Sequence, residues 1–552
     1  MASAPAPLAA AFGQNDSWRW DQSVATLAAV APHQHFRSYP DYSNTLFSFL
    51  NRVATNLERE FPDRFITTYA YQWTENVPRF PVHPNVLPYL TADRSQWFDP
   101  AFAENDRDLL QRWGQAGPRF FGVYDYYYGA PFLVPRPTLF AVRDSIPFAA
   151  QAGARAFYAE SYPNWGLDGP KLWLAAQLLW DPTRDSAALL DEYYFRYWKE
   201  AAAPMRRFFE RCDLQYLTQP RPGYWIKYFK DEHQRVLFPP EARKDLFAFL
   251  HEAESLVKNP IVRERLALVQ AAFTVSDLFC RHGELSDLLA RLTHDATTDS
   301  DTLRRAIAAV TSARAELITT HARVQRDFPL ALSAELIPEY LRNDPRPRAL
   351  RILAERGIES PIEQPLLKTV FAEKKPSRQE LTLTGAELLT DGSFATIRKK
   401  NLHPFIALDW TEPNSPWKGK GEPFETRGIE LLAATAGSRS LRYAGVNQEG
   451  LYQTIAVEPG VLYRATVKVR GKVSPGNMTF LLLTFANKTG KNIDDGHIDR
   501  LPIGEWNEWT ILETIVRAPQ GASLLGFGLR ALYQVNDDFV EFASPSLRRL
   551  QP

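Results

Sequence analysis

The sequence predicts a multidomain chain in which an α/β region, an all-α region and an all-β region follow one another. Strand and helix patterns alternate from residue 7 to about 183, and helical periodicity then continues without strand signals to about 372. Beyond a polar linker at 374–378, apolar and polar residues alternate with frequent Gly and Pro. At 552 residues the chain is too long for one hydrophobic core. We therefore expect a partial (β/α) barrel at 1–183, a helical domain at 184–375 and a β-sandwich at 380–552.

The first region has the pattern of βα units that build a parallel sheet. Its predicted strands are 7–14, 65–71, 119–125 and 154–160, and its predicted helices are 44–60, 106–115, 139–152 and 171–180. A complete TIM-type barrel needs eight strands and about 250 residues. We therefore expect the C-terminal half of a barrel, with an open sheet, 7–14 at one edge, 154–160 near the other, and a chain truncated at its N-terminus.

The rest of the chain divides into helices and then short strands. Helices are predicted at 187–211, 240–257, 262–281 and 301–327, and strands at 440–443, 452–457, 463–469 and 478–485. Turns at 459–460 and 475–476 separate strands in the antiparallel manner of a sandwich, for which we expect a jelly-roll arrangement.

The composition narrows the classes of partner. The 64 Lys and Arg balance the 64 Asp and Glu, which gives no electrostatic case for nucleic acid or an anionic membrane. No apolar run has the length of a membrane helix, and the start lacks the basic segment of a signal peptide. The two cysteines, Cys212 and Cys280, have neither metal spacing nor a disulfide framework. We expect no metal and no cofactor.

Three predicted strands end in a carboxylate: Asp16 after Asn15, then Asp125, then Glu160. The C-terminal ends of parallel strands meet on one face, where barrel enzymes carry their catalytic groups. Glycoside hydrolysis uses two carboxyl groups on either side of the scissile bond. The alternative for each acid is a structural one, because a strand-terminal Asp is often a helix cap or the partner of an arginine.

Aromatic residues beside these strand ends suggest a sugar-binding cleft, since aromatic rings stack on pyranoses. The candidate substrate-binding residues are Trp18, Tyr71, Trp73, Tyr124, Tyr126 and Trp165, and in the sandwich Trp410 and Trp417. The alternative is that each ring belongs to a hydrophobic core. Asp168-Gly-Pro-Lys171 has the composition of a turn and a helix start.

Several segments together resemble a bacterial family catalogued as domain of unknown function 4838. They include Tyr42-Ser-Asn-Thr-Leu-Phe, Tyr124-Asp-Tyr-Tyr127, Pro135-Arg-Pro137, Leu167-Asp-Gly-Pro-Lys171 and Leu189-Leu-Asp-Glu-Tyr-Tyr194. The resemblance covers roughly residues 7–290. The family is linked to glycoside hydrolase family 163, whose members are endo-β-N-acetylglucosaminidases that act on N-glycans. The resemblance to this family implies a secreted or periplasmic protein.

The C-terminal region has a resemblance of its own. Ala386-Glu-Leu-Leu-Thr-Asp-Gly-Ser-Phe394, the stretch 452–463 and Trp506-Asn-Glu-Trp509 are similar to carbohydrate-binding modules of families 4 and 9. The resemblance implies a sandwich that binds glycans, although sandwiches of this kind also occur as structural domains.

These resemblances imply a retaining hydrolase of an N-acetylglucosamine-containing glycan. Glu160 is the expected general acid/base, and we expect Phe157, Tyr158 and Tyr162 to bury it and favour its neutral form. Asn15 and Asp16 would orient a substrate acetamido group, or Asp16 would attack directly, with Asp125 as the second choice. The rival hypothesis is a non-catalytic glycan-binding protein with an incomplete, inactive barrel.

Overall fold

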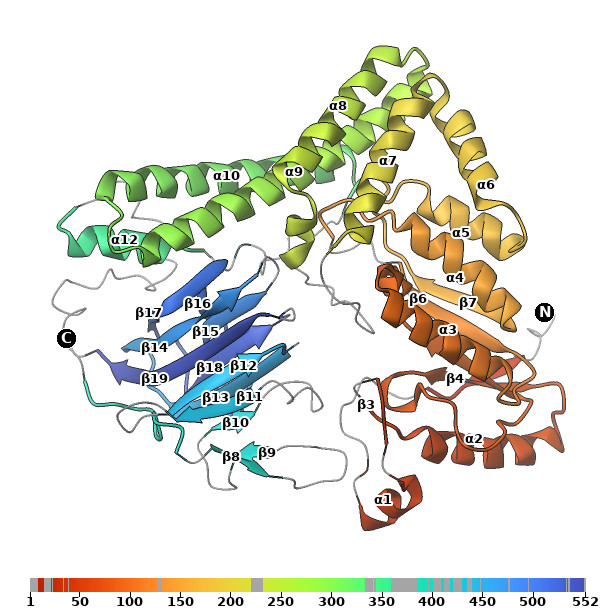
Figure 1. The fold of residues 1–552 in the computed structure, drawn as a ribbon, viewed down its shortest axis with the longest axis horizontal. Coiled ribbons are helices and arrows are strands. Elements are labelled where there is room, and N and C mark those ends of the chain that lie inside the picture. Colours follow the sequence, from red (N-terminus) through yellow and green to blue (C-terminus); the bar gives the residue numbers. More distant parts are fainter. Residues whose placement is uncertain are drawn as a thin grey trace. The chain divides into compact units, whose positions relative to one another are not determined.

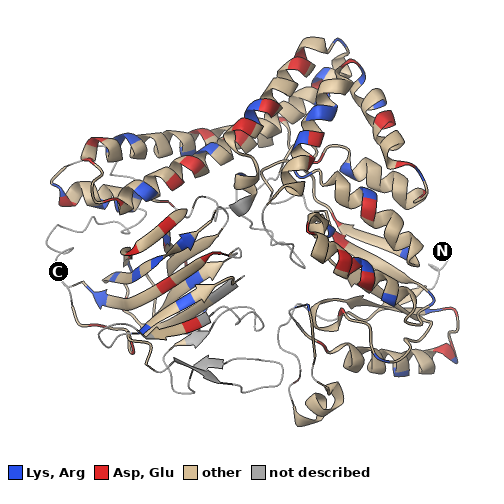
Figure 2. Cartoon of the chain, viewed as in Figure 1, with Lys and Arg blue, Asp and Glu red and all other residues tan. Residues whose placement is uncertain are grey.

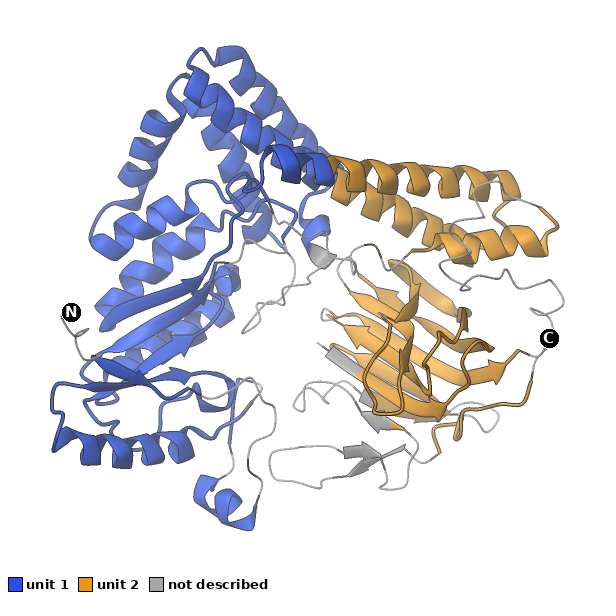
Figure 3. Cartoon of the chain, turned by 180° about the vertical axis from the view of Figure 1, so that it is seen from behind, with its two compact units in different colours: residues 1–277, 322–335 blue, residues 278–321, 336–552 orange. Residues whose placement is uncertain are grey.

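The computed structural model describes residues 8–13, 21, 23–32, 34–37, 39–127, 132–219, 232–332, 341, 344–358, 385–395, 397–400, 409–411, 417–419, 429–433, 439–446, 448–474, 477–494, 496–532, 534 and 537–550. It divides into two compact units, residues 1–277 with 322–335 and residues 278–321 with 336–552 (Figure 3). In each unit, acidic and basic side chains are interspersed along the helices and strands (Figure 2). The boundaries near 183 and 380 remain predictions.

Unit 1 contains a parallel five-stranded sheet in the order β1-β4-β5-β6-β7 (Figure 1). Its strands are β1 (Ala9–Ala11), β4 (Phe65–Ala70), β5 (Val86–Thr91), β6 (Phe121–Tyr126) and β7 (Ala154–Glu160). β1 and β7 are the edge strands, as the sequence predicts. The expected count of four strands is wrong, because β5 lies at the centre of the sheet. A proline, Pro88, interrupts its pattern and pairs in register with Thr68.

Helices cover one face of this sheet. They are α2 (Ser43–Glu58), α3 (Pro100–Gly114), α4 (Leu139–Gln151) and α5 (Lys171–Trp180). α2 buries Phe47, Leu50 and Ala54, which recur at helical spacing. From β7, Phe157 and Ala159 pack against the buried side chains of α4 and α5. We call this the covered face, and the opposite face the open face.

Short elements and a series of longer helices complete the α-helical part. The short elements are α1 (Val24–Val30), β2 (His35–Phe36), β3 (Tyr39–Pro40), η1 (Gln72–Thr74), η2 (Arg94–Phe98), η3 (Tyr194–Trp198), η4 (Lys199–Ala201) and η5 (Glu232–Leu237). The remaining helices are α6 (Ser186–Tyr193), α7 (Ala202–Leu217), α8 (Pro240–Leu256), α9 (Pro260–His294), α10 (Ser300–Asp327) and α12 (Arg346–Glu355). The single helix predicted at 187–211 is therefore broken, with a π-helical turn at η3. No helix in the described ranges is both long and apolar enough for a bilayer crossing.

Unit 2 contains two five-stranded antiparallel sheets, in the orders β10-β13-β18-β15-β16 and β11-β12-β19-β14-β17. Their strands are β10 (Lys418–Gly419), β11 (Ile429–Ala433), β12 (Arg439–Ala444), β13 (Gln448–Ala456), β14 (Leu462–Val473), β15 (Met478–Ala486), β16 (His497–Leu501), β17 (Gly504–Arg517), β18 (Leu524–Leu532) and β19 (Phe539–Arg549). A separate pair joins β8 (Ile397–Lys400) and β9 (Asp409–Thr411). One hydrophobic core draws side chains from both sheets, for example Val467 and Phe542 from one and Leu483 and Phe527 from the other. The jelly-roll arrangement stays a prediction.

Candidate active site

The open face of the parallel sheet carries a row of tyrosines near the C-terminal ends of its strands. Tyr69 on β4, Tyr124 on β6 and Tyr158 on β7 share this face, because side chains alternate along a strand and the register aligns them. The ring centroids of Tyr69 and Tyr124 are 5.5 Å apart, and those of Tyr124 and Tyr158 are 4.8 Å apart. Tyr69 and Tyr158 are 40% and 53% exposed. The face thus offers aromatic surface to a ligand.

Gly122 lies among these tyrosines and, because it has no side chain, does not project from the open face. It lies in register with Tyr89 of β5, and a Cβ atom placed on Gly122 would approach the Tyr89 ring to 2.5 Å. That distance is shorter than van der Waals contact. The Tyr89 ring therefore occupies the space that any larger residue at this position would need.

Glu160, the last residue of β7, adds a carboxylate to the open face. Tyr124 Oη donates a hydrogen bond of 2.6 Å to Glu160 Oε1. Burial, then the hydrogen bond to Glu160 and the charge of its carboxylate, raise the pKa of Tyr124. Tyr124 is therefore a phenol and a donor at neutral pH. In the described ranges no residue bonds Glu160 Oε2, which leaves this oxygen to a ligand.

The expectation that Phe157, Tyr158 and Tyr162 bury Glu160 is wrong. Phe157 lies on the covered face, and Tyr158 and Tyr162 are 53% and 42% exposed. The reason is parity: Phe157 is three residues from Glu160 along the strand, so the two side chains point to opposite faces.

Asp125 lies on the covered face, which corrects its expected place in the cleft. Its side chain is buried, and Oδ1 accepts hydrogen bonds from the backbone N–H groups of Arg94 (3.1 Å) and Tyr126 (2.7 Å). Oδ2 is 3.8 Å from Arg94 Nη1. Burial raises the pKa of Asp125 to about 6, although the charge of Arg94 opposes the shift. Asp125 is therefore the partner of an arginine, which was the alternative to a catalytic role.

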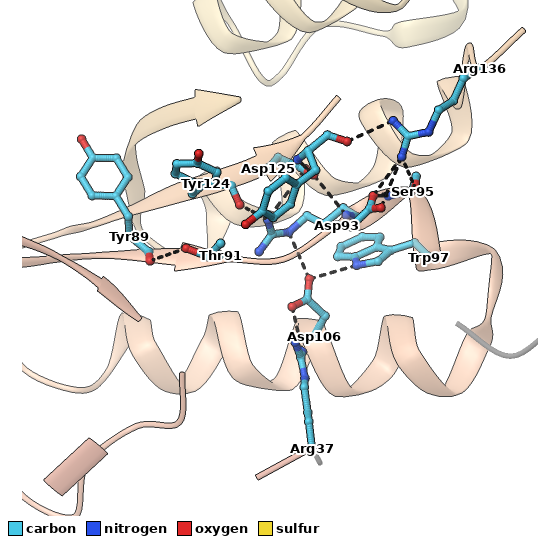
Figure 4. Close-up of polar contacts among 12 residues, drawn as sticks. Arg37, Tyr89, Thr91, Asp93, Ser95, Trp97, Asp106, Tyr124, Asp125 and Arg136 are labelled. Carbon is cyan, nitrogen blue, oxygen red and sulfur yellow. Dashed lines mark hydrogen bonds and ion pairs between the residues drawn. The ribbon is translucent and has the colours of Figure 1, made fainter. Parts of the chain in front are cut away.

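Arg94 joins Asp125 to a second buried carboxylate, that of Asp106 on α3. Figure 4 shows Asp125 and Asp106 with their polar contacts. Arg94 Nε is 3.1 Å from Asp106 Oδ2, and Arg37 Nη2 is 2.9 Å from Asp106 Oδ1. Trp97 Nε1 donates to Asp106 Oδ2 over 3.0 Å. Burial favours protonation of Asp106, but the charges of Arg94 and Arg37 outweigh it and lower the pKa of Asp106. This network fastens α3 to the covered face.

Two further buried cations hold the loops that follow β5 and β6. Arg136 Nη2 donates to Asp93 Oδ1 (3.2 Å) and Ser95 Oγ (2.8 Å), and Arg136 Nη1 donates to Tyr126 O (3.1 Å). Lys171 Nζ donates to Asp168 Oδ1 (3.0 Å) and to backbone carbonyls.

The expected turn and helix start at 168–171 are present, with Gly169 at φ +58° and α5 beginning at Lys171. Burial raises the pKa of Asp168 to about 6. The ion pair between Lys171 and Asp168 is not predicted from the sequence, and the 135–137 and 167–171 motifs were the available signal for it.

The candidate aromatic residues differ in how deeply the structure buries them. Trp73 and Trp417 are core residues: Trp73 packs on Tyr42 at 5.2 Å between centroids, and Trp417 packs on Phe394 at 5.3 Å. This corrects their expected stacking role. Tyr126 is buried on the open face, Tyr71 is half-buried, and Trp165 is 45% exposed. The residues Asn15, Asp16 and Trp18 and the side chain of Trp410 lie outside the described residues. Among those described, no three His, Cys, Asp or Glu side chains gather into a metal site.

Comparison with known proteins identifies this part of the chain. Residues 13–211 match the family model described as Domain of unknown function (DUF4838). This segment is similar to the DUF4838 family over about a third of the chain. The match confirms the family resemblance over strands β4 to β7, the helices that cover the sheet and the start of the α-helical part. No curated protein matches the chain.

Solved structures resemble the chain in part. BtGH115A, a family GH115 4-O-methyl-α-glucuronidase with specificity for decorated arabinogalactans, is 11% identical with a TM-score of 0.32. The match covers 91% of this chain and 61% of that chain, so the chain spans less than two thirds of that enzyme.

Two carbohydrate-binding modules match smaller parts of the chain. TmCBM61, solved with β-1,4-galactotriose, is 15% identical over 30% of this chain and 99% of that chain, with a TM-score of 0.22. The xylan-binding CBM22-1 domain of Paenibacillus barcinonensis Xyn10C is 15% identical over 25% of this chain and 88% of that chain, with a TM-score of 0.19.

Proposed function

We propose that the chain is a glycoside hydrolase that cleaves an N-acetylglucosamine-containing glycan with retention of configuration. The observation that supports this best is the placement of Glu160. It combines a strand-end position in a parallel sheet, an open aromatic face, one oxygen held by Tyr124 and a second oxygen without a bond to a described residue. The resemblance of the DUF4838 domain to family 163 supplies the substrate class.

In this proposal Glu160 is the general acid/base. The Tyr124 hydroxyl fixes the carboxyl group through Oε1, so that Oε2 gives its proton to the departing glycosidic oxygen and later takes one from water. Asp16 is the proposed second group, either orienting the substrate acetamido oxygen with Asn15 or attacking the anomeric carbon itself. Direct attack requires about 5–5.5 Å between the two carboxyl groups. The place of Asp125 on the covered face argues against this role for it.

A hydrolysis assay on N-glycan and chitooligosaccharide substrates tests the proposal. We expect Glu160→Gln to lower kcat by at least about 100-fold, because general acid catalysis contributes about 10²–10⁴-fold. The matched control is Glu104→Gln, which removes an exposed carboxylate from α3 in the same unit and should leave kcat unchanged. Equal rates for Glu160→Gln and the unaltered chain would contradict the assignment.

The second candidate is a non-catalytic glycan-binding protein whose sandwich is a module of the family 4 or 9 type. One observation favours it: of the residues on β4, β5, β6 and β7, Glu160 is the only carboxylate on the open face. This candidate predicts that immobilised chitooligosaccharides slow the migration of the chain in affinity electrophoresis, and that no cleavage product forms. Product formation that depends on Glu160 would exclude it.

A further inference from the structure

A cleft within unit 2 separates helix α12 from the outer face of the sheet that contains β14, β17 and β19. Its volume is about 480 Å³, in the range of small-ligand sites. Helix α12 contributes Arg348, Arg351, Ile352 and Glu355, which share one helix face. The residues from α9 and the strands are Thr293, Arg464, Thr466, Ile511, Glu513, Ser546 and Arg548.

The strands place two arginines side by side in this cleft. Arg464 on β14 lies directly opposite Arg548 on β19 in the antiparallel register. Like charges at such positions destabilise a sheet. Glu513 compensates only in part, because its two oxygens bind Arg464 and Arg351. Arg548 has a more distant carboxylate, with Nε 3.5 Å from Glu387 Oε2. The cleft therefore concentrates guanidinium groups at a cost to the fold.

The terminal nitrogens of these two arginines are available to a ligand. Arg464 binds Glu513 through Nε, and Arg548 uses Nε for Ser546 and Glu387. Within the described ranges, their Nη1 and Nη2 atoms donate to no residue. A guanidinium carries five N–H donors in a planar fork that matches an oxyanion with two oxygens. Two such forks on adjacent strands form a site for one oxyanion.

The helix above the site is held in place independently of any ligand. Arg348 Nη1 donates to Asp499 Oδ2 over 2.5 Å, and Nη2 donates to the carbonyl of Ile511 over 3.1 Å. Nη2 also lies 3.2 Å from Nδ1 of His294. Burial, with the charge of Arg348, lowers the pKa of His294 to about 4, so the imidazole is neutral and accepts this hydrogen bond. A cleft that is already formed binds a ligand without an ordering cost.

We propose that this cleft binds an acidic sugar residue, with its carboxylate or sulfate ester between Arg464 and Arg548. The volume exceeds what a bare oxyanion fills. The rest of the lining suits a sugar ring, because Thr466 adds a hydroxyl group and Ile352 adds apolar surface to the cleft. This site lies in unit 2 and does not depend on the hydrolase proposed for the DUF4838 domain.

Isothermal titration calorimetry of the full chain tests the proposal with four probes: glucuronate, glucose 6-sulfate, glucose and inorganic sulfate. We expect at least one acidic sugar to bind at least tenfold more tightly than glucose and sulfate. The two acidic probes distinguish a carboxylate from a sulfate ester. Absence of heat from both acidic sugars at millimolar concentration would overturn the proposal, and so would equal binding of glucose or of inorganic sulfate.

Variants locate the binding. Arg464→Gln and Arg548→Gln should each weaken the Kd at least tenfold, whereas Arg470→Gln is the matched control. Arg470 lies on the same strand and face as Arg464, but it pairs with Glu541 and does not line the cleft. Two different arginines are tested, because Arg464 also supports Glu513. An unchanged Kd in both cleft variants would refute the site. Glu160→Gln should bind the acidic sugar normally, so failure of the hydrolase proposal would leave this test intact.

Discussion

Asp125 and Glu160 lie on adjacent strands and have opposite environments. In the register of β6 and β7, Asp125 faces Ala159 and Tyr126 faces Glu160. This offset of one residue puts Asp125 on the covered face among arginines and Glu160 on the open face beside tyrosines. The end of a strand therefore tells at which edge of the sheet a carboxylate lies. Side chains alternate between the two faces along a strand, so the exact position of the residue decides which face it points to and whether a ligand can reach it.

The two faces also differ in what holds their carboxylates. On the covered face, Asp125 and Asp106 are buried and depend on the charge of Arg94. On the open face, Glu160 depends on one hydroxyl and on solvent. We therefore expect substitutions on the covered face to change the free energy of unfolding, and those on the open face to change ligand chemistry.

The largest expected effect is that of Arg94→Met. Removal of the guanidinium leaves Asp106 and Asp125 buried without their shared cation, which should lower the free energy of unfolding by about 3–5 kcal/mol. Urea denaturation followed by tryptophan fluorescence measures this change. Arg52→Met, at an exposed site on α2, is the control and should change it by less than about 0.5 kcal/mol. Similar losses in both variants would show that the network does not stabilise the fold.

The second prediction is that the difference in stability between Asp125→Asn and the unaltered chain depends on pH. The pKa of Asp125 is about 6 in the folded chain and about 3.8 unfolded, so the folded state binds the proton more tightly. Protonation stabilises the fold below about pH 4, and this contribution disappears as the pH rises through 6. The unaltered chain should therefore gain stability over Asp125→Asn, on the order of 1–3 kcal/mol, as the pH falls from 7.5 to 4.

The measurement is the difference in free energy of unfolding between the two proteins across that pH range. Asp168 and Asp213, whose pKa values burial raises to about 6, titrate in both proteins and cancel in the difference. Asp63→Asn removes an exposed carboxylate and serves as the control. A difference independent of pH would contradict a buried, proton-binding Asp125.

The smallest expected effect on stability is that of Tyr124→Phe. Loss of one hydrogen bond to the half-buried Glu160 should lower the free energy of unfolding by about 0.5–1.5 kcal/mol. Under the proposed function, kcat should fall by a larger factor than KM rises, because Glu160 Oε2 is no longer oriented. Tyr158→Phe, on the same face, is the control for loss of an exposed hydroxyl. A greater loss of stability than in Arg94→Met would invert the comparison.

The fold was predictable where one periodicity dominated. The alternation that predicts strands at 65–71 and 154–160 and the helical spacing of α2 both correspond to the observed elements. β5 was missed because Pro88 lacks an N–H and argues against a central strand. The family was predictable because its motifs are local in sequence, and the 13–211 match confirms it.

The site was only partly predictable. Counting positions along β6 separates Asp125 from Tyr124, but which face the helices cover follows from packing of residues such as Phe157 against α4 and α5. Arg94 begins the short helix η2, and Arg136 lies between β6 and α4, so no sequence periodicity constrains either side chain. The same limit applies to Trp73 and Trp417, whose burial depends on neighbours distant in sequence.

The close packing of Gly122 against Tyr89 means that β5 and β6 together set the contour of the open face, whereas Glu160 lies on β7. A single methyl group at position 122 would approach the Tyr89 ring to 2.5 Å and push it aside. Under the proposed function, the contour that a sugar ring meets can therefore change while Glu160 stays in place. Under the same proposal, substitutions at 122 and 89 would change which sugar ring the open face accepts without replacing Glu160.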